Sequence, residues 1–122
     1  MSKMIEIEVD FSDLFYKKLG LKSHDTYEKA LDNTIDHATH DAENTCRREA
    51  PIDTGNLRRS IHKNKPGKCQ GEILAQDAPY WVYLQWGTSK MDANPFVSRT
   101  ISEVGPKLPK YFHEELKHMG VL

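Results

Sequence analysis

The segment Ile52–Asn56 contains an Asp-Thr-Gly triplet, which is the signature around the catalytic aspartate of aspartic proteases. Two such carboxylates, brought together by dimerisation, would titrate at separated pKa values as acid–base chemistry requires. That chemistry needs the aspartate on a tight loop between buried strands, whereas Asp53 follows a long helical pattern through Ala50 and Pro51. We therefore interpret Asp53 or Thr54 as the cap of a turn and do not predict a protease.

Histidines offer a second chemical interpretation. His37 and His40 stand three residues apart, Asp41 follows four residues after His37, and Cys46 lies further on. In a helix this spacing places two possible metal ligands on one face. Two ligands do not make a site, however, and the other histidines are scattered along the chain. We interpret them as surface histidines and expect neither a metal nor a cofactor.

Covalent catalysis and phosphate binding have no readable pattern either. No Ser-His-Asp arrangement can be recognised from spacing, and the Gly-Thr-Ser-Lys segment at 87–90 lacks the upstream glycines of a P-loop. We expect a protein that is not an enzyme.

Nucleic-acid binding has more support in the residues. Basic residues cluster on a predicted hairpin, and four aromatic residues follow within 80–86, which together suit single-stranded nucleic acid. The basic residues are Arg58, Arg59, Lys63, Lys65 and Lys68. Against this, the aromatic residues lie in an unbroken apolar run that is typical of a core, and the net charge of −1 is not that of a strong binder. A DNA-contacting module that uses the basic segment Arg47–Lys68 stays open as the alternative function.

Composition limits the class of protein. A chain of 122 residues suits one domain, here 1–122. No apolar run approaches the roughly 20 residues that span a bilayer, and the first residues predict no signal peptide. The two cysteines form no CxxC pair, which favours a reducing compartment. We expect no membrane association.

The charges are separated along the chain. Asp25–Glu43 is acidic, opposed only by Lys29, whereas Arg47–Lys68 is basic against Glu49 and Asp53 alone. Adjacent blocks of opposite sign make the chain a dipole. They are either solvated faces or the two sides of a contact.

Periodicity predicts the elements of the first half. Alternation over Ile5–Phe11 predicts a strand that is apolar on one face and acidic on the other. Phe11–Leu21 is expected to form a short helical turn or loop, after which Ser23 or Asp25 caps a long helix that Pro51 stops. Apolar and small residues form one stripe along this helix: Tyr27, Ala30, Leu31, Thr34, Ile35, Ala38, Ala42, Thr45 and Cys46.

The second half begins with a hairpin over 60–76, turning at Lys-Pro-Gly-Lys. Tyr80–Trp86 is expected to be sheet or short-helix core. Pro95 suits the first turn of a helix that Gly105 and two prolines interrupt, and 110–120 resumes as a final helical segment. The predicted fold is α+β: a small antiparallel sheet with a long N-terminal helix and a C-terminal helix.

Three ordered motifs within 51–101 resemble the tail-component family of lambdoid phages, which is related to the minor tail protein Z of lambda. The first motif is matched by Pro51, Asp53, Thr54, Gly55, Leu57, Arg58 and Ser60. The second is matched by Tyr80, Tyr83, Leu84, Gln85, Trp86, Gly87 and Thr88, and the third by Lys90, Met91, Ala93, Pro95 and Phe96. Trp81, where the family usually has Ala, and Gln85, where Glu is common, depart from the pattern.

The resemblance implies a structural virion protein at the neck or tail top, without catalysis. Such a protein acts in tail completion and head–tail joining. It would form a homo-oligomeric ring next to other neck, connector or tail proteins, and DNA would pass through its channel without specific binding. It would be made in the host cytoplasm and end in the virion.

This role suggests positions for four groups of residues. Gly55 and Gly87 would supply backbone geometries in loops where subunits meet. A head-to-tail ring could place an acidic helix against the basic segment of the next subunit, with Asp32, Asp36 and Glu43 facing Arg58, Arg59 and Lys63. The edge of the aromatic segment, with Trp86 and Phe96, would reach the neighbour. Glu6, Glu8 and Asp10 would line the channel, or else simply face solvent.

Overall fold

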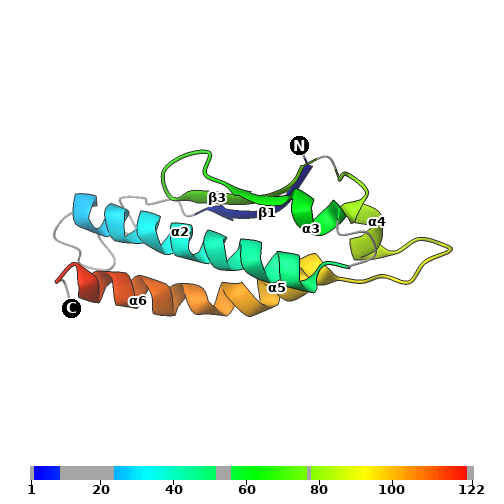
Figure 1. Cartoon of the computed structure of the whole chain (residues 1–122). Helices are drawn as coiled ribbons and strands as arrows, with labels where there is room; N and C mark the ends of the chain where they lie inside the picture. The colour runs from blue at the N-terminus through cyan, green and yellow to red at the C-terminus, as the bar shows by residue number, and fades with distance from the viewer. Residues whose placement is uncertain (1, 9–23, 52–55, 77, 121–122) are drawn as a thin grey trace.

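The computed structural model describes residues 2–8, 24–51, 56–76 and 78–120. Its elements are β1 (Ser2–Glu8), α2 (His24–Glu49), α3 (Asn56–Ser60), β2 (Ile61–Asn64), β3 (Gln70–Ala75), α4 (Trp81–Trp86), α5 (Phe96–Val104), a 3-10 turn (Gly105–Lys107) and α6 (Leu108–His118). Figure 1 shows three layers: the antiparallel sheet, then α2, then α5 and α6. The predicted α+β class is confirmed.

The helix α2 is the middle layer and is therefore covered on two sides. Its predicted stripe is buried from Ala30 to Cys46, which confirms the helix and its buried face. Small residues in the stripe let the sheet approach closely. Thr34 and Thr39 donate their hydroxyl hydrogens to the carbonyls of Ala30 and Ile35, at 2.8 and 2.6 Å, so these buried hydroxyls are satisfied.

The sheet has the order β1-β3-β2, and β3 is its central strand. Ile5 pairs with Ile73 and Ile7 with Gly71 on the face toward α2, while Glu6 and Glu8 are exposed. The predicted alternation is therefore confirmed over the described part of the strand. β1 begins at Ser2, three residues earlier than expected, and residues 9–11 lie outside the described residues.

Gly71 is where β3 meets α2. A Cβ atom at Gly71 would lie 2.0 Å from Oγ1 of Thr39, well inside van der Waals contact. The absence of a side chain at Gly71 therefore allows β3 to lie this close to α2.

The predicted hairpin is formed by β2 and β3, and residues 65–69 connect them. The short helix α3 before it was not predicted. Arg58 and Arg59 lie on α3 and not on the hairpin, so their predicted placement was wrong. Five residues are too few to show helical periodicity, and Leu57 is the only buried one among them.

The last layer is one helical rod with a 3-10 turn at the predicted interruption. Pro109 lies in the first turn of α6, where its missing N–H removes no hydrogen bond. The hydroxyl of Tyr111 donates to Asp41, and the ring stacks on His37 with centroids 3.9 Å apart. Tyr111 thereby attaches α6 to α2.

Phe96 lies inside the core, with 0% of its surface exposed. The expectation that it reaches a neighbouring subunit was wrong. Phe96 begins α5, and its side chain fills the space among α2, α5 and the sheet because it belongs to the central hydrophobic cluster.

Candidate functional site

The aromatic segment forms the short helix α4, and most of its apolar side chains are exposed. Tyr83 and Trp86 expose 61% and 71% of their surface, and Tyr80 and Val82 expose 40% each. Only Trp81, Leu84 and Gln85 lie inward. The prediction of a core segment was therefore wrong for four of these residues, because a helix of one and a half turns on the surface can bury only one side. We call Tyr80, Val82, Tyr83 and Trp86 the aromatic face.

Gln85 attaches α4 to the start of α5. Its Oε1 accepts from the backbone N–H of Val97 at 2.9 Å, and its Nε2 donates to Oγ of Ser98 at 2.6 Å. A buried side chain from another helix thus caps α5, whose own N-cap residue, Pro95, makes no side-chain bond. Sequence reasoning missed this role because donor and acceptor lie 12 residues apart, beyond any local capping pattern.

A projecting arm, residues 87–94, follows α4 (Figure 1). Gly87 has φ of 79°, and a Cβ there would lie 2.8 Å from the backbone N of Ala93, so the predicted need for glycine is confirmed. Thr88 and Met91 exchange two backbone hydrogen bonds, of 2.9 and 3.3 Å, and so close the tip. The backbone N–H of Asn94 donates to the carbonyl of Leu84 at 2.8 Å and fixes the base.

The arm is ordered by its own hydrogen bonds and yet packs on little of the chain. Residues 88–93 are all exposed, including the apolar side chain of Met91. The arm and the aromatic face together make up one end of the molecule (Figure 1). Pro95 ends the arm and Pro51 ends α2, as their motifs suggested; Asp53, Thr54 and Gly55 lie outside the described residues.

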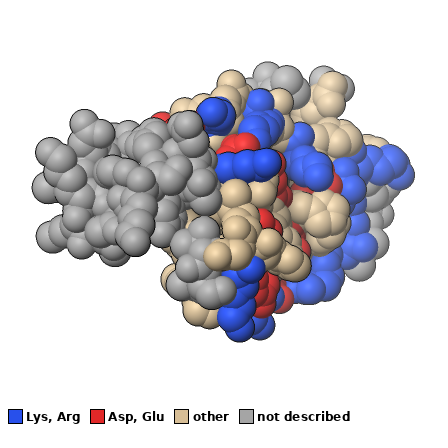
Figure 2. Space-filling view, turned by 90° about the vertical axis from the view of Figure 1, so that its left-hand side faces the viewer, with Lys and Arg blue, Asp and Glu red and all other residues tan. Residues whose placement is uncertain are grey.

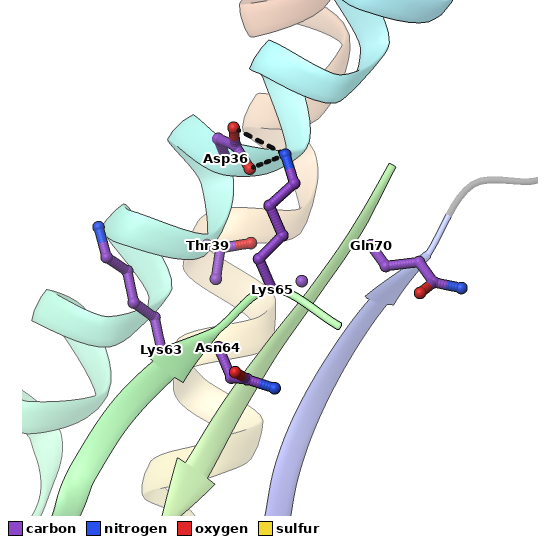
Figure 3. Close-up of a pocket in the computed structure, with 7 residues that line it drawn as sticks. Asp36, Thr39, Lys63, Asn64, Lys65 and Gln70 are labelled. Carbon is purple, nitrogen blue, oxygen red and sulfur yellow. Dashed lines mark hydrogen bonds and ion pairs between the residues drawn. The ribbon is translucent and has the colours of Figure 1, made fainter. Parts of the chain in front are cut away.

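The acidic face of α2 meets the basic hairpin within the same chain. Nζ of Lys65 lies 2.7 Å from Asp32 and 3.1 Å from both carboxylate oxygens of Asp36, as Figure 3 shows for Asp36. Partial burial tends to raise the pKa of Asp32, but hydrogen bonds from Lys65 and from the backbone N–H of Cys69 outweigh it and lower that pKa. The same contact with Asp32 raises the pKa of Lys65.

The other residues proposed for a contact between subunits also have partners within the chain. Glu43 accepts the backbone N–H of Lys63 at 2.6 Å. Arg58 donates to the carbonyls of Arg48 and Ala50 at the end of α2, and Arg59 donates to Asn56. Intramolecular hydrogen bonds therefore already engage these residues, which argues against the hypothesis of charge pairing between subunits.

A hollow of about 400 Å³ lies between α2 and the hairpin, lined by Asp36, Thr39, Lys63, Asn64, Lys65, Gln70 and Gly71 (Figure 3). Its two lysines could contact phosphate, but Lys65 is bound by two carboxylates, and Nζ of Lys63 lies 3.2 Å from Nδ1 of His40. Lys68, which does not line the hollow, lies 3.1 Å from Glu28. Figure 2 shows red carboxylates interspersed among the blue side chains on this end of the molecule. A phosphate group would have to compete with these carboxylates, which weakens the DNA-binding alternative.

The outer face of the sheet carries the carboxylates proposed for a channel. Glu6 and Glu8 are exposed there, and Lys3 lies 3.0 Å from Glu72 and 3.7 Å from Glu6. Glu8 accepts from the amide of Gln70 at 3.1 Å. Asp10 lies outside the described residues. The described part of this face therefore has more acidic than basic side chains.

The described residues contain no cluster of three or more His, Cys, Asp or Glu that could hold a metal ion. Burial raises the pKa of the Cys46 thiol to about 11, so at neutral pH it is not a thiolate nucleophile. The hydrogen bond to Asp41 raises the pKa of Tyr111 to about 12. Among the helices that the structure describes, none has the length and hydrophobicity to cross a membrane.

Comparisons of the chain with protein-family models, with curated proteins and with solved structures found no match. The three sequence motifs and the exposed surfaces of the chain are therefore what indicates its function.

Proposed function

We propose that this chain is a structural virion protein of a tailed phage or prophage. It would act in tail completion or head–tail joining at the neck, as a ring of identical subunits around the DNA channel. The three family-like motifs support this role. The observation that carries it is the exposed aromatic face of α4 beside a projecting arm.

Exposed aromatic residues of this kind are typical of the centre of an interface. Tyr and Trp side chains bury a large area for little loss of conformational entropy, and large contiguous apolar patches are uncommon on monomers. The arm adds a second argument, because this ordered loop, with its exposed Met91, packs against little of the part of the chain that the structure describes. In an assembly, a neighbouring subunit would cover both features.

The proposed ring requires a head-to-tail contact between subunits. The aromatic face and the arm lie at one end of an elongated molecule, and in a ring they would contact a different surface of the next copy. A contact between two different surfaces closes into a ring when the rotation between subunits permits it.

Substitution of Trp86 by Ala tests this function. Trp86 is 71% exposed, so we expect the free energy of unfolding to change by no more than about 0.5 kcal/mol. The ring seen by native mass spectrometry and electron microscopy should dissociate. The control is Lys117→Ala, an exposed position on α6 at the opposite end, which should leave the ring intact.

Two results would contradict the proposal. One is a wild-type chain that stays monomeric at high concentration and does not attach to purified tails. The other is a Trp86→Ala variant that forms normal rings, since the contact would then not use the aromatic face.

A further inference from the structure

The outer edge of β1 has backbone groups that point away from the sheet. The backbone N–H of Gln76 donates to the carbonyl of Ser60 at 2.7 Å, in the same register as the β2–β3 pairs. Because the direction of the backbone groups alternates along a strand, the N–H and C=O groups of the even-numbered residues of β3 point toward β2. The odd-numbered residues must then bond toward β1, and they engage Ile5 and Ile7 through Ile73 and Gly71. The N–H and C=O groups of Glu6 and Glu8 therefore point outward, and within the described ranges no residue pairs with them.

An apolar groove of about 370 Å³ runs beside this edge. It lies between β1 and the rod formed by α5, the 3-10 turn and the start of α6. Apolar side chains from both sides line it, namely Ile5, Ile7, Ile101, Val104 and Leu108. Ile101 is 51% exposed, although it lies on the same helix as the fully buried Phe96. The groove thus offers apolar surface next to unpaired backbone groups.

We propose that β1 accepts an extended segment of a partner protein as a fourth strand, and that this segment alternates apolar and basic residues. Strand addition uses the backbone groups of the edge for affinity and alternate side chains for specificity. One set of side chains would enter the apolar groove. The other set would lie on the outer face beside Glu6 and Glu8, where Lys or Arg gives favourable cross-strand pairs.

A second copy of this chain is a poor occupant. Pairing β1 antiparallel with its own copy about Glu6 would place two Glu6 carboxylates directly opposite each other, and like charges opposite each other are destabilising. The carboxylates beside the groove thus select a basic partner. This site is separate from the aromatic face and does not depend on ring formation.

Titration of the full chain with labelled peptides tests the proposal. The first peptide is a seven-residue alternation of Lys with Ile and Val, and the second carries Glu in place of each Lys. In fluorescence anisotropy we expect the basic peptide to bind at least about fivefold more tightly, since two cross-strand charge pairs change sign. A third peptide has the basic sequence with alternate backbone amides N-methylated, and it should lose binding because it cannot form the ladder.

Variants of the chain locate the site. Ile101→Lys places a charge in the groove at a half-exposed position and should weaken binding of the basic peptide at least about tenfold. Its matched control is Ser102→Lys, which adds the same charge at the next residue, an exposed position that does not line the groove. Joint substitution of Glu6 and Glu8 by Lys should reverse the preference, so that the acidic peptide binds more tightly.

Amide hydrogen exchange identifies the backbone groups involved. The basic peptide should slow exchange at Glu6 and Glu8. The proposal is overturned by equal binding of the basic and acidic peptides, by unchanged binding of the N-methylated peptide, or by no binding at millimolar concentration. It is also overturned if the protein alone protects these two amides as its concentration rises, because the occupant would then be a second copy.

Discussion

The two edges of the sheet differ in what lies beside them. At the β2 edge, Arg47 of α2 donates two N–H groups to the carbonyl of Ile61, at 2.9 and 2.6 Å. Glu43 of the same helix accepts the N–H of Lys63 at 2.6 Å. At the β1 edge, the neighbours are the apolar side chains of the groove, such as Ile101 and Val104. One edge is closed by charged side chains, and the other adjoins a hydrophobic hollow.

The difference between the two edges indicates which strand of the sheet can pair with another chain. An open strand edge is a template for pairing with another chain, and proteins that must not aggregate cover or charge such edges. Here the last turns of α2 place one donor and one acceptor, Arg47 and Glu43, against the backbone of β2. No described residue does the same for β1. We therefore interpret the β2 edge as protected and the β1 edge as available for a partner.

The largest effect should come from the central strand, on which both edges depend. Gly71→Ala places a Cβ 2.0 Å from Oγ1 of Thr39, so β3 must move away from α2. We expect a loss of at least about 2 kcal/mol in the free energy of unfolding, measured in urea. Because Thr39→Ala removes the clashing atom, the double variant should recover part of that loss. A Gly71→Ala protein of wild-type stability would contradict the packing described here.

Opening the protected edge should have an intermediate effect. Arg47→Met keeps much of the apolar stem but leaves the carbonyl of Ile61 without its charged donor, and we expect a loss of about 1–2 kcal/mol. The variant should also aggregate faster, as followed by light scattering, because β2 becomes an open edge. Arg48→Met is the control, since its pair with Glu103 is at the surface and contributes at most about 1 kcal/mol. Equal effects of the two substitutions would show that Arg47 does not close the edge.

The smallest loss of stability should come from removing the ion pairs between the turn of the β2–β3 hairpin and α2. Lys65→Met removes the partner of Asp32, and we expect a loss below about 1 kcal/mol at neutral pH, since the lysine is partly exposed. The pKa of Asp32 is lower in the folded chain than its ordinary value of 3.8. The contribution of this pair is therefore fully present above that value and disappears as the pH falls through the folded pKa.

Unfolding curves of the wild type and the Lys65→Met variant, measured from pH 7 to pH 2, check the sign of this linkage. The two stabilities should converge at the acidic end. A difference that stays constant with pH would mean that Lys65 stabilises the hairpin by packing and not by its charge.

Local signals in the sequence predicted most of the elements. These signals depend on residues a few positions apart. They are the stripe along α2, the end of α2 before Pro51, the turn between β2 and β3, and the start of α5 after Pro95. The candidate site was predicted less well. Trp86 and Phe96 were both expected at a contact between subunits, yet one is 71% exposed and the other is completely buried.

The sequence alone therefore determined the α+β class, the position of each long element and the glycine at residue 87. Only the tertiary structure decided that α4 exposes its aromatic face, that Gln85 caps α5, and that the acidic helix binds the basic hairpin of its own chain. The physical reason is the range of the interactions. Helix periodicity and turns act over about four residues, whereas Lys65 and Asp32 are 33 residues apart and meet only because α2 lies along the hairpin.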